Sequence, residues 1–186
     1  MATNTNTRNG VDVHGLTTTI DAVRENPSLA RFQFRSQSRW EEGARATTTI
    51  DSFYGAGSEH EHARTHTLQG DEPAVLLGSD TAPNAVETVL ASLASCLAVG
   101  YAYNAAAQGI EIEQLTFELE GDFDLHAFLG LSDDTRPGYE QIRVRYRVKS
   151  PASRDQLVAL CDHVQKTSPV LDIIANEVPV SIDLVD

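Results

Sequence analysis

The segment NAVETVLASLASCLAVGYAYNAAAQG, residues 84–109, is the strongest structural signal in this 186-residue chain. It is rich in small and apolar residues, carries no charge after Glu87, and ends in a glycine, as helices commonly do. Asn84 followed three residues later by Glu87 is the pattern of a capping box at a helix start. The segment therefore predicts a long, buried central helix with Cys96 in its middle.

The flanking segments predict strands and shorter helices around this helix. Strands are indicated where apolar residues alternate with polar ones, and helices where they recur at a spacing of three or four. The predicted strands are residues 31–40, 44–53, 60–68, 114–124, 141–149 and 178–185. The predicted helices are residues 16–26, 153–167 and a short turn after Pro169. This grouping favours an α+β fold with an antiparallel sheet packed on the central helix.

Composition narrows the class of protein. The length and the 41% hydrophobic content predict one domain over residues 13–186, after a polar, disordered segment of residues 1–12. An excess of 27 acidic over 14 basic residues argues against nucleic acid as a partner. Because the start lacks a signal-peptide pattern and no apolar run approaches the roughly 20 residues of a membrane span, a soluble, cytoplasmic protein without a membrane partner is expected.

Two patterns of polar side chains on the predicted strands can be explained without a functional site. Residues 114–122 carry acidic side chains and residues 141–149 carry arginines on the polar face, so the charges should pair across the two strands. In residues 60–66, alternation places His60, His62, Arg64 and His66 on one face. Histidines in that pattern can bind a transition metal, but Arg64 opposes a cation, and an exposed polar face is the alternative.

Three stretches carry a resemblance to a known family. They are DEPAVLLGSDTAPNAVETVLASLASCLAVGYAYNAAAQGIEI (71–112), GDFDLHAFLGL (121–131) and KTSPVLDII (166–174). The chain resembles the OsmC/Ohr family of osmotically inducible and organic hydroperoxide resistance proteins over roughly residues 30–186. Its most specific feature is a glutamate nine residues before a cysteine in a small-residue helix.

The resemblance implies an intertwined homodimer and a cysteine that reduces hydroperoxides. It assigns the peroxide-attacking thiol to Cys96 and the glutamate at the helix start to Glu87. The second family cysteine, which resolves the oxidised thiol, corresponds to Ser168, so the chain is a divergent member. A sulfenic acid must condense with another thiol before it is reduced, and Ser168 has none. Cys161 lies on an apolar helical face, about 10 Å of helix rise away, and is predicted to pack in the core.

A cation beside Cys96 is needed for the proposed chemistry, because only the thiolate attacks a peroxide and the helix dipole does not extend three turns into a helix. Arg64 is the first choice for this cation and Arg45 the second. Glu87 and Cys96 are about 2.5 turns apart and point to opposite sides of a straight helix. They share a site only through a helix break or a partner chain, and otherwise Glu87 serves only the capping box.

Two functions from different classes follow. The first is thiol-dependent reduction of organic or hydrogen peroxides in oxidative-stress defence, a peroxiredoxin-like activity, with Cys96, Glu87 and Arg64 as catalytic residues and neither cofactor nor metal. Its partners would be a small hydroperoxide and a thiol reductant. The second is a non-catalytic homodimer on the same fold that binds a small apolar ligand, with Cys96 lining the pocket.

Overall fold

The computed structural model describes residues 7–185, and the chain divides into two compact units. One unit, called here the thiol unit, contains the chain up to Val13 and from Leu90 onward. The other, called here the sheet unit, is His14–Val89. Helix α2 (Ala85–Ala107) begins in the sheet unit and continues in the thiol unit, so the predicted central helix is confirmed. The α+β class is confirmed as well.

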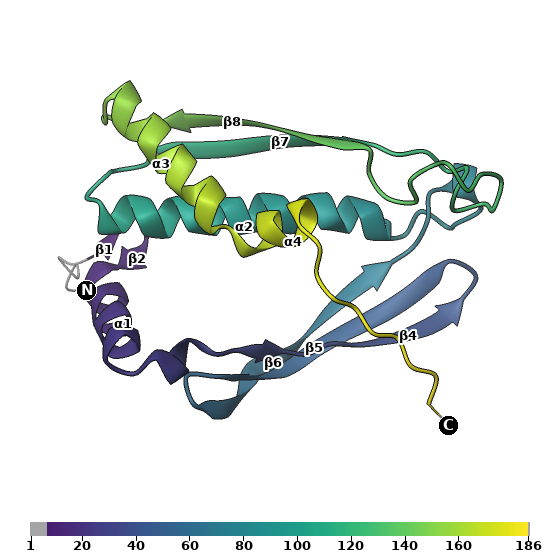
Figure 1. The fold of residues 1–186 in the computed structure, drawn as a ribbon, viewed down its shortest axis with the longest axis horizontal. Helices are drawn as coiled ribbons and strands as arrows, with labels where there is room; N and C mark the ends of the chain where they lie inside the picture. Colours follow the sequence, from purple (N-terminus) through teal and green to yellow (C-terminus); the bar gives the residue numbers. More distant parts are fainter. Residues whose placement is uncertain (1–6, 186) are drawn as a thin grey trace. The chain divides into compact units, whose positions relative to one another are not determined.

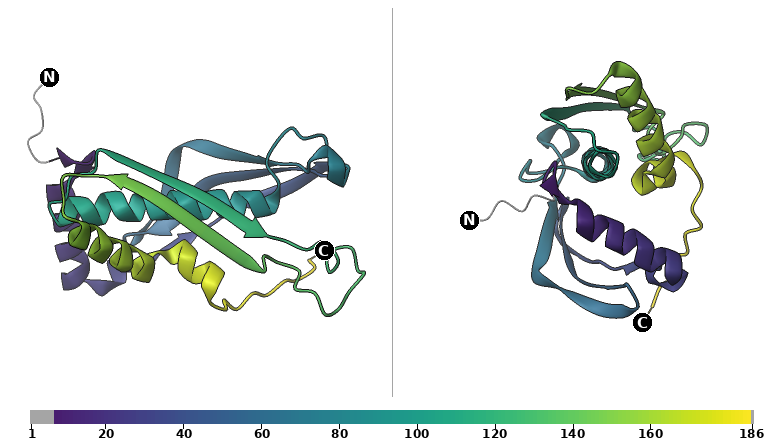
Figure 2. Two further views of the ribbon diagram at one scale, coloured as in Figure 1. Left: turned by 90° about the horizontal axis from the view of Figure 1, so that it is seen from above. Right: turned by 90° about the vertical axis from the view of Figure 1, so that its left-hand side faces the viewer.

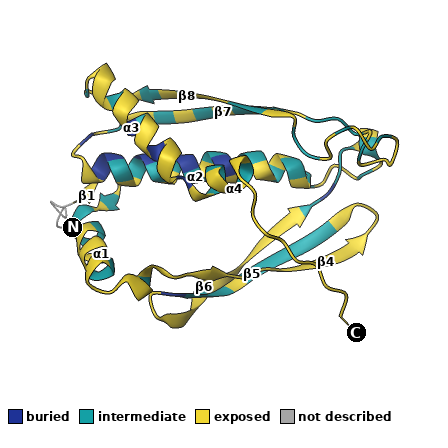
Figure 3. Ribbon diagram, viewed as in Figure 1, coloured by how far each residue is buried: buried dark blue, intermediate teal, exposed yellow. Residues whose placement is uncertain are grey.

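The thiol unit is built around α2. The hairpin of β7 (Gln114–Asp122) and β8 (Gln141–Lys149) covers one side of the helix, and α3 (Arg154–Thr167) and α4 (Pro169–Ala175) lie along another (Figures 1 and 2). Figure 3 shows the buried residues gathered mainly on α2 and α3. The core cluster consists of Leu93, Leu97, Tyr101, Ala105, Ile110, Leu160 and Val164.

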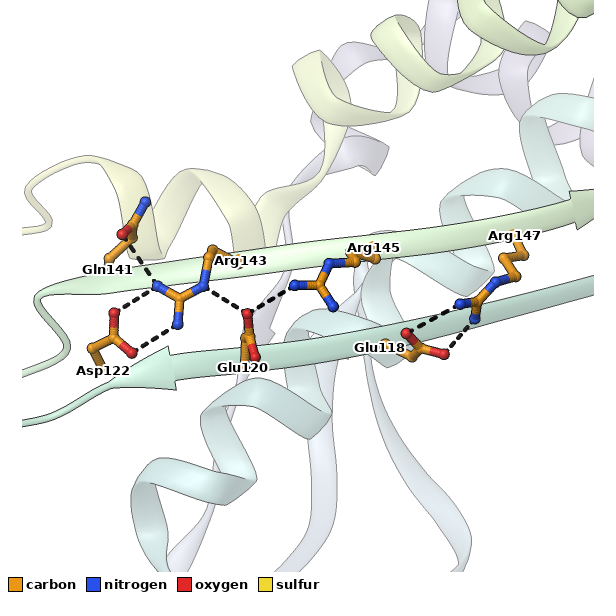
Figure 4. A network of polar contacts seen from close by, with 7 residues as sticks. All are labelled: Glu118, Glu120, Asp122, Gln141, Arg143, Arg145 and Arg147. Carbon is orange, nitrogen blue, oxygen red and sulfur yellow. Dashed lines mark hydrogen bonds and ion pairs between the residues drawn. The ribbon is translucent and has the colours of Figure 1, made fainter.

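The hairpin of β7 and β8 has one apolar and one charged face, as predicted. Phe117 and Tyr146 stack near Tyr101 of α2, with ring centroids 5.8 Å and 5.3 Å from the Tyr101 ring. On the other face, Arg143 pairs with Glu120 at 2.7 Å, and further pairs link the two strands (Figure 4). Exposed pairs of this kind add little stability, so this face is a solvated surface.

The prediction that residues 1–12 are disordered is wrong for residues 7–12; residues 1–6 lie outside the described residues. Strands β1 (Thr7–Arg8) and β2 (Val11–Asp12) pair around an Asn9-Gly10 turn with positive φ angles of 52° and 78°. Asn-Gly is the strongest short hairpin signal, and it accounts for this turn. The Asn9 side chain anchors the turn by bonding the backbone of Ile110 at 3.0 Å and of Ile112 at 2.9 Å.

The predicted C-terminal strand does not form within this chain. Residues 177–185 have no regular secondary structure, and their alternating apolar side chains are exposed, with Ile182 at 93%. A strand needs a neighbouring strand to take its backbone hydrogen bonds, and no strand among the described residues pairs with this segment. The alternation alone therefore does not make residues 177–185 a strand.

The sheet unit holds the three predicted antiparallel strands. Central strand β5 (Arg45–Gly55) pairs on one side with β6 (Ser58–Gly70) and on the other with the short β3 (Gln33–Phe34) and β4 (Gln37–Glu42). The first predicted strand is therefore interrupted after Phe34. Helix α1 (Val13–Glu25), which starts at the unit boundary, and the 3₁₀ turn η1 (Pro27–Ala30) precede the sheet and confirm the predicted early helix.

One face of this sheet carries a row of aromatic rings. Phe32, Phe34 and Phe53 stack, and Phe53 contacts His60 and His62 with ring centroids 5.1 Å and 5.2 Å away. His62 and His66 meet edge to face at 4.8 Å. The described residues contain no group of three or more His, Cys, Asp or Glu side chains arranged to hold a metal ion. The histidines therefore belong to an aromatic surface.

The loop between β6 and α2 is folded around Asp71. This carboxylate is only 2% exposed and accepts hydrogen bonds from the backbone of Glu72 and Ser79 and from both the backbone and the hydroxyl of Thr81. These bonds hold the pKa of Asp71 at about 2. Gly78 lets the loop close, since an added Cβ would lie 1.8 Å from the Glu72 carbonyl oxygen.

Helix α2 also corrects an expectation about membranes. Its 23 residues are long and apolar enough to cross a bilayer by length and composition, although no such run was expected. The core helix of a soluble protein meets the same criterion. Its apolar side chains Val99 and Tyr103 are 57% and 48% exposed, so the thiol unit leaves part of the helix uncovered.

Asp71→Asn should destabilise the protein at neutral pH, because an amide replaces a carboxylate that accepts four hydrogen bonds. The pKa of Asp71 is lowered in the folded state. The ionised carboxylate therefore stabilises the folded protein above its unfolded-state pKa of about 4, and this stabilisation is lost as the pH falls toward about 2. Urea unfolding should show a difference between variant and wild type that shrinks over this range.

Asp80→Asn is the matched control, since it makes the same charge change at an exposed position of the same loop. A difference that is independent of pH, or equal in the two variants, would contradict this role of Asp71.

Candidate active site

The Cys96 thiol lies against the Ser168 hydroxyl. Cys96 is half-buried in the middle of α2, and its Sγ is 3.3 Å from Oγ of Ser168, which is 5% exposed. The two residues are 72 positions apart in the chain. Position 168 is the one that the family resemblance assigns to the second cysteine. The structure therefore brings the residue at that position into contact with Cys96.

The junction between α3 and α4 places Ser168 at this point. Ser168 ends α3 and caps α4, and its Oγ accepts a hydrogen bond from the Leu171 N–H at 3.3 Å. Pro169 follows as the first residue of α4, where its missing N–H is not needed. The segment Ser-Pro therefore positions a buried side-chain oxygen in contact with Cys96 of α2.

Packing between α2 and α3 sets the distance. An added Cβ on Gly100 would lie 3.0 Å from Cγ1 of Val164, so the glycine allows α3 to approach closely. Gly100 lies four residues after Cys96, and Val164 lies four residues before Ser168. Because four residues are about one helical turn, the contacts Cys96–Ser168 and Gly100–Val164 are successive steps of one antiparallel interface.

Glu87 closes the predicted capping box. Its carboxylate accepts from the Asn84 N–H at 2.9 Å, and the Asn84 side-chain oxygen accepts from the Glu87 N–H at 2.8 Å. Helix α2 continues through Glu87 and Cys96 without a break. The helix break that would bring the two side chains together is thus absent, and a catalytic role of Glu87 stays a prediction that needs a partner chain.

The two candidate arginines differ in their charge partners. Arg45 forms an ion pair with Glu42 at 3.2 Å, whereas Arg64 on β6 forms no ion pair within residues 7–185. A guanidinium without a carboxylate keeps its charge available for another anion. The choice of Arg64 over Arg45 stays a prediction, and this difference favours it.

Cys161 is a packing residue, as predicted. It is half-buried on α3, packs against the core cluster, and its Sγ lies 3.2 Å from the Gln165 side-chain nitrogen. The neighbouring Tyr101 hydroxyl is buried and has no hydrogen-bond partner among the described residues. Burial, reinforced by the nearby Cys161 thiol, raises the pKa of Tyr101, so this phenol remains neutral.

Comparisons with known proteins agree with this fold. A family model described as OsmC-like protein matches residues 78–183, and no curated protein sequence matches the chain. Among solved structures, an OsmC-like protein from Mycoplasma pneumoniae is 17% identical with a TM-score of 0.59, covering 77% of this chain and 87% of its own. An OsmC-like protein of unknown function from Vibrio cholerae is 14% identical with a TM-score of 0.55, covering 75% and 92%.

A third solved structure is described as an organic hydroperoxide resistance protein OsmC from Legionella pneumophila. It is 14% identical with a TM-score of 0.52, and the match covers 76% of this chain and 89% of that one. At these identities the three structures establish a shared fold.

The wild-type protein should form no Cys96–Cys161 disulfide on treatment with peroxide, because the two thiols have different neighbours, Ser168 and Gln165. The Ser168→Cys variant, in contrast, should form an intramolecular bridge to Cys96, since the two side chains already meet. Non-reducing peptide mapping distinguishes the bridges. A Cys96–Cys161 bridge in high yield would show that the helices rearrange and that this geometry is not the reacting one.

Proposed function

Because this chain belongs to the OsmC-like protein family, we propose that it reduces organic or hydrogen peroxides through the Cys96 thiol, as part of oxidative-stress defence. The observation that carries the proposal is the 3.3 Å contact between Cys96 Sγ and Ser168 Oγ, which retains the paired positions of the family's thiol site. The solved Legionella protein of the same fold, described as an organic hydroperoxide resistance protein, supports the same chemistry.

The reaction begins with attack of the Cys96 thiolate on one peroxide oxygen. The O–O bond breaks, the sulfur is oxidised to a sulfenic acid, and the other oxygen leaves as an alcohol, or as water from hydrogen peroxide, after taking up a proton. Ser168 cannot resolve this sulfenic acid. A small-molecule thiol therefore condenses with it, releasing water and forming a mixed disulfide. A second thiol then regenerates Cys96 and releases the small-molecule disulfide.

A cation is required beside the thiolate, since a partly buried thiol is otherwise held in its neutral form. We assign this cation to Arg64, because no carboxylate among the described residues pairs with it. Glu87 would hold that arginine from a second copy of the chain. Neither a metal nor a bound cofactor has a role in these steps.

Cys96→Ser should abolish hydroperoxide consumption in the presence of a small thiol, while Cys161→Ser, the matched control, should retain it. Arg64→Ala should slow the reaction by about tenfold or more, as expected when a charge-assisted contact to the reacting anion is removed. Intact mass after one equivalent of hydroperoxide should show one added oxygen on Cys96, reversed by thiol.

Equal consumption by Cys96→Ser and wild type would refute the enzyme proposal. A Cys96 that gains no oxygen and is not alkylated would favour the alternative, a protein that binds a small apolar ligand.

We also propose that the functional form is a homodimer with α2 at the interface. Val99 and Tyr103 leave an exposed apolar stretch on α2, and the apolar residues of the C-terminal tail alternate without a strand partner. Both features are explained by a second copy that covers the helix and pairs with the tail, as strand addition does in other assemblies. A cytoplasmic location remains an expectation that agrees with this soluble dimer.

Sedimentation at micromolar concentration should show a dimer. Val99→Glu should shift the equilibrium toward the monomer, because a charge cannot be buried unpaired in an apolar interface. The matched control is Val158→Glu, a change at an exposed position of α3. A wild-type protein that sediments as a stable monomer would contradict the proposal.

A further inference from the structure

The buried Ser168 hydroxyl has a donor proton with one acceptor in reach. Its oxygen already accepts from the Leu171 N–H, and with 5% exposure the residue has little access to water. Within residues 7–185, the Cys96 sulfur is the only atom placed to accept from this hydroxyl, at 3.3 Å. A buried hydroxyl without an acceptor is unfavourable, so the proton is directed to the sulfur.

The strength of a hydrogen bond from Ser168 to Cys96 depends on the charge of the sulfur. A neutral thiol is a weak acceptor, whereas hydrogen bonds to an ionised group are roughly twice as strong as neutral ones. A donor that has no other acceptor therefore stabilises the thiolate more than the thiol. The same reasoning applies to backbone donors that stabilise carboxylates, as at Asp71 in this chain.

We propose that Ser168 is a catalytic hydrogen-bond donor that holds Cys96 as a thiolate, taking up a different task at the position of the second family cysteine. This role deepens the proposed function and rests on it, because a thiolate is needed only where Cys96 attacks a peroxide. Ser168 contributes no redox step. It prepares the sulfur before the attack and leaves the sulfenic acid to an external thiol.

The neighbouring helices supply no competing charge contact to the sulfur. The acidic residue of α4, Asp172, is occupied with Asn176 at 2.8 Å. The titratable side chains of α3 form no hydrogen bond or ion pair with Cys96 in the described structure; they are Arg154, Asp155, Cys161, Asp162, His163 and Lys166. Ser168 is thus the polar group that acts on Cys96 within the thiol unit.

The test measures alkylation of Cys96 by iodoacetamide from about pH 5 to about pH 10, a range that brackets ordinary thiol ionisation. All proteins carry Cys161→Ser, so that one thiol reacts. Ser168→Ala should move the midpoint of the pH profile upward by about one unit, which slows alkylation about tenfold below the midpoint. The plateau at high pH should stay unchanged, because the thiol is then fully ionised in both proteins.

Two further variants keep the test independent of folding. Ser168→Gly also lacks the hydroxyl but costs a helix cap only slightly, and should show the same shift. Ser168→Thr retains a hydroxyl and a capping oxygen, and should restore the wild-type midpoint. Ser153→Ala is the matched control, because it removes the N-cap serine of α3 in the same unit. Its profile should follow the wild type.

A Ser168→Ala or Ser168→Gly profile that coincides with the wild type would overturn the inference. So would a change in the plateau alone, which reports altered access to the sulfur. The alkylation assay contains no peroxide, so the two proposals fail separately. A Ser168-dependent midpoint without hydroperoxide consumption refutes the peroxidase alone, and consumption with an unshifted midpoint refutes the role of Ser168 alone.

Discussion

The close approach of α3 to α2 at Gly100 is the constraint on which the thiol site depends. Helix packing distances follow from the side chains at the contact, and here one side contributes only a hydrogen. Val164 fills the space that a side chain at position 100 would need. One turn further along both helices, the same spacing brings Ser168 to Cys96. The site is thus a consequence of core packing rather than of a separate loop.

Serine at position 168 keeps the architecture and changes the chemistry. A serine is among the best N-cap residues, and this one starts α4 by accepting from Leu171. Its oxygen contacts Cys96, but it cannot form a disulfide. The proposed redox cycle would therefore need a second thiol from solution, with the Ser168 hydroxyl as a hydrogen-bond donor. At position 168, capping of α4 and contact with Cys96 therefore do not require the ability to form a disulfide.

Much of the fold was predictable from local sequence patterns. The capping box of Asn84 and Glu87, the alternation in β7 and β8, and the cap of α3 each act over a few residues, so a short window contains all the interacting groups. The hairpin at Asn9-Gly10 depends on an equally local signal. The contact of Ser168 with Cys96 spans 72 residues, and spacing alone carries no signal for it; only the family resemblance pointed there.

The residues of the candidate site also differ in how far the sequence predicts them, because contacts made only on folding leave no local pattern. Cys96 stands out by residue type within a recognisable helix. The preference for Arg64 over Arg45 had no charge contact to support it in the sequence, because the ion pair of Arg45 with Glu42 is visible only in the folded structure. A hydrogen-bond donor role for Ser168 had no signal in the sequence. It depends on burial and on the absence of another acceptor among residues 7–185, which are properties of the packed structure.

The C-terminal tail has the alternating pattern of a strand but does not form one in this structure. Alternating apolar residues record which side chains must be buried, without specifying which chain buries them. Val180, Ile182 and Leu184 alternate as in a strand and yet are 80% or more exposed. The exposed apolar positions of α2 raise the same question on a helix. The proposed homodimer would answer both, because one symmetric association would cover a helix face and supply a strand partner for each tail.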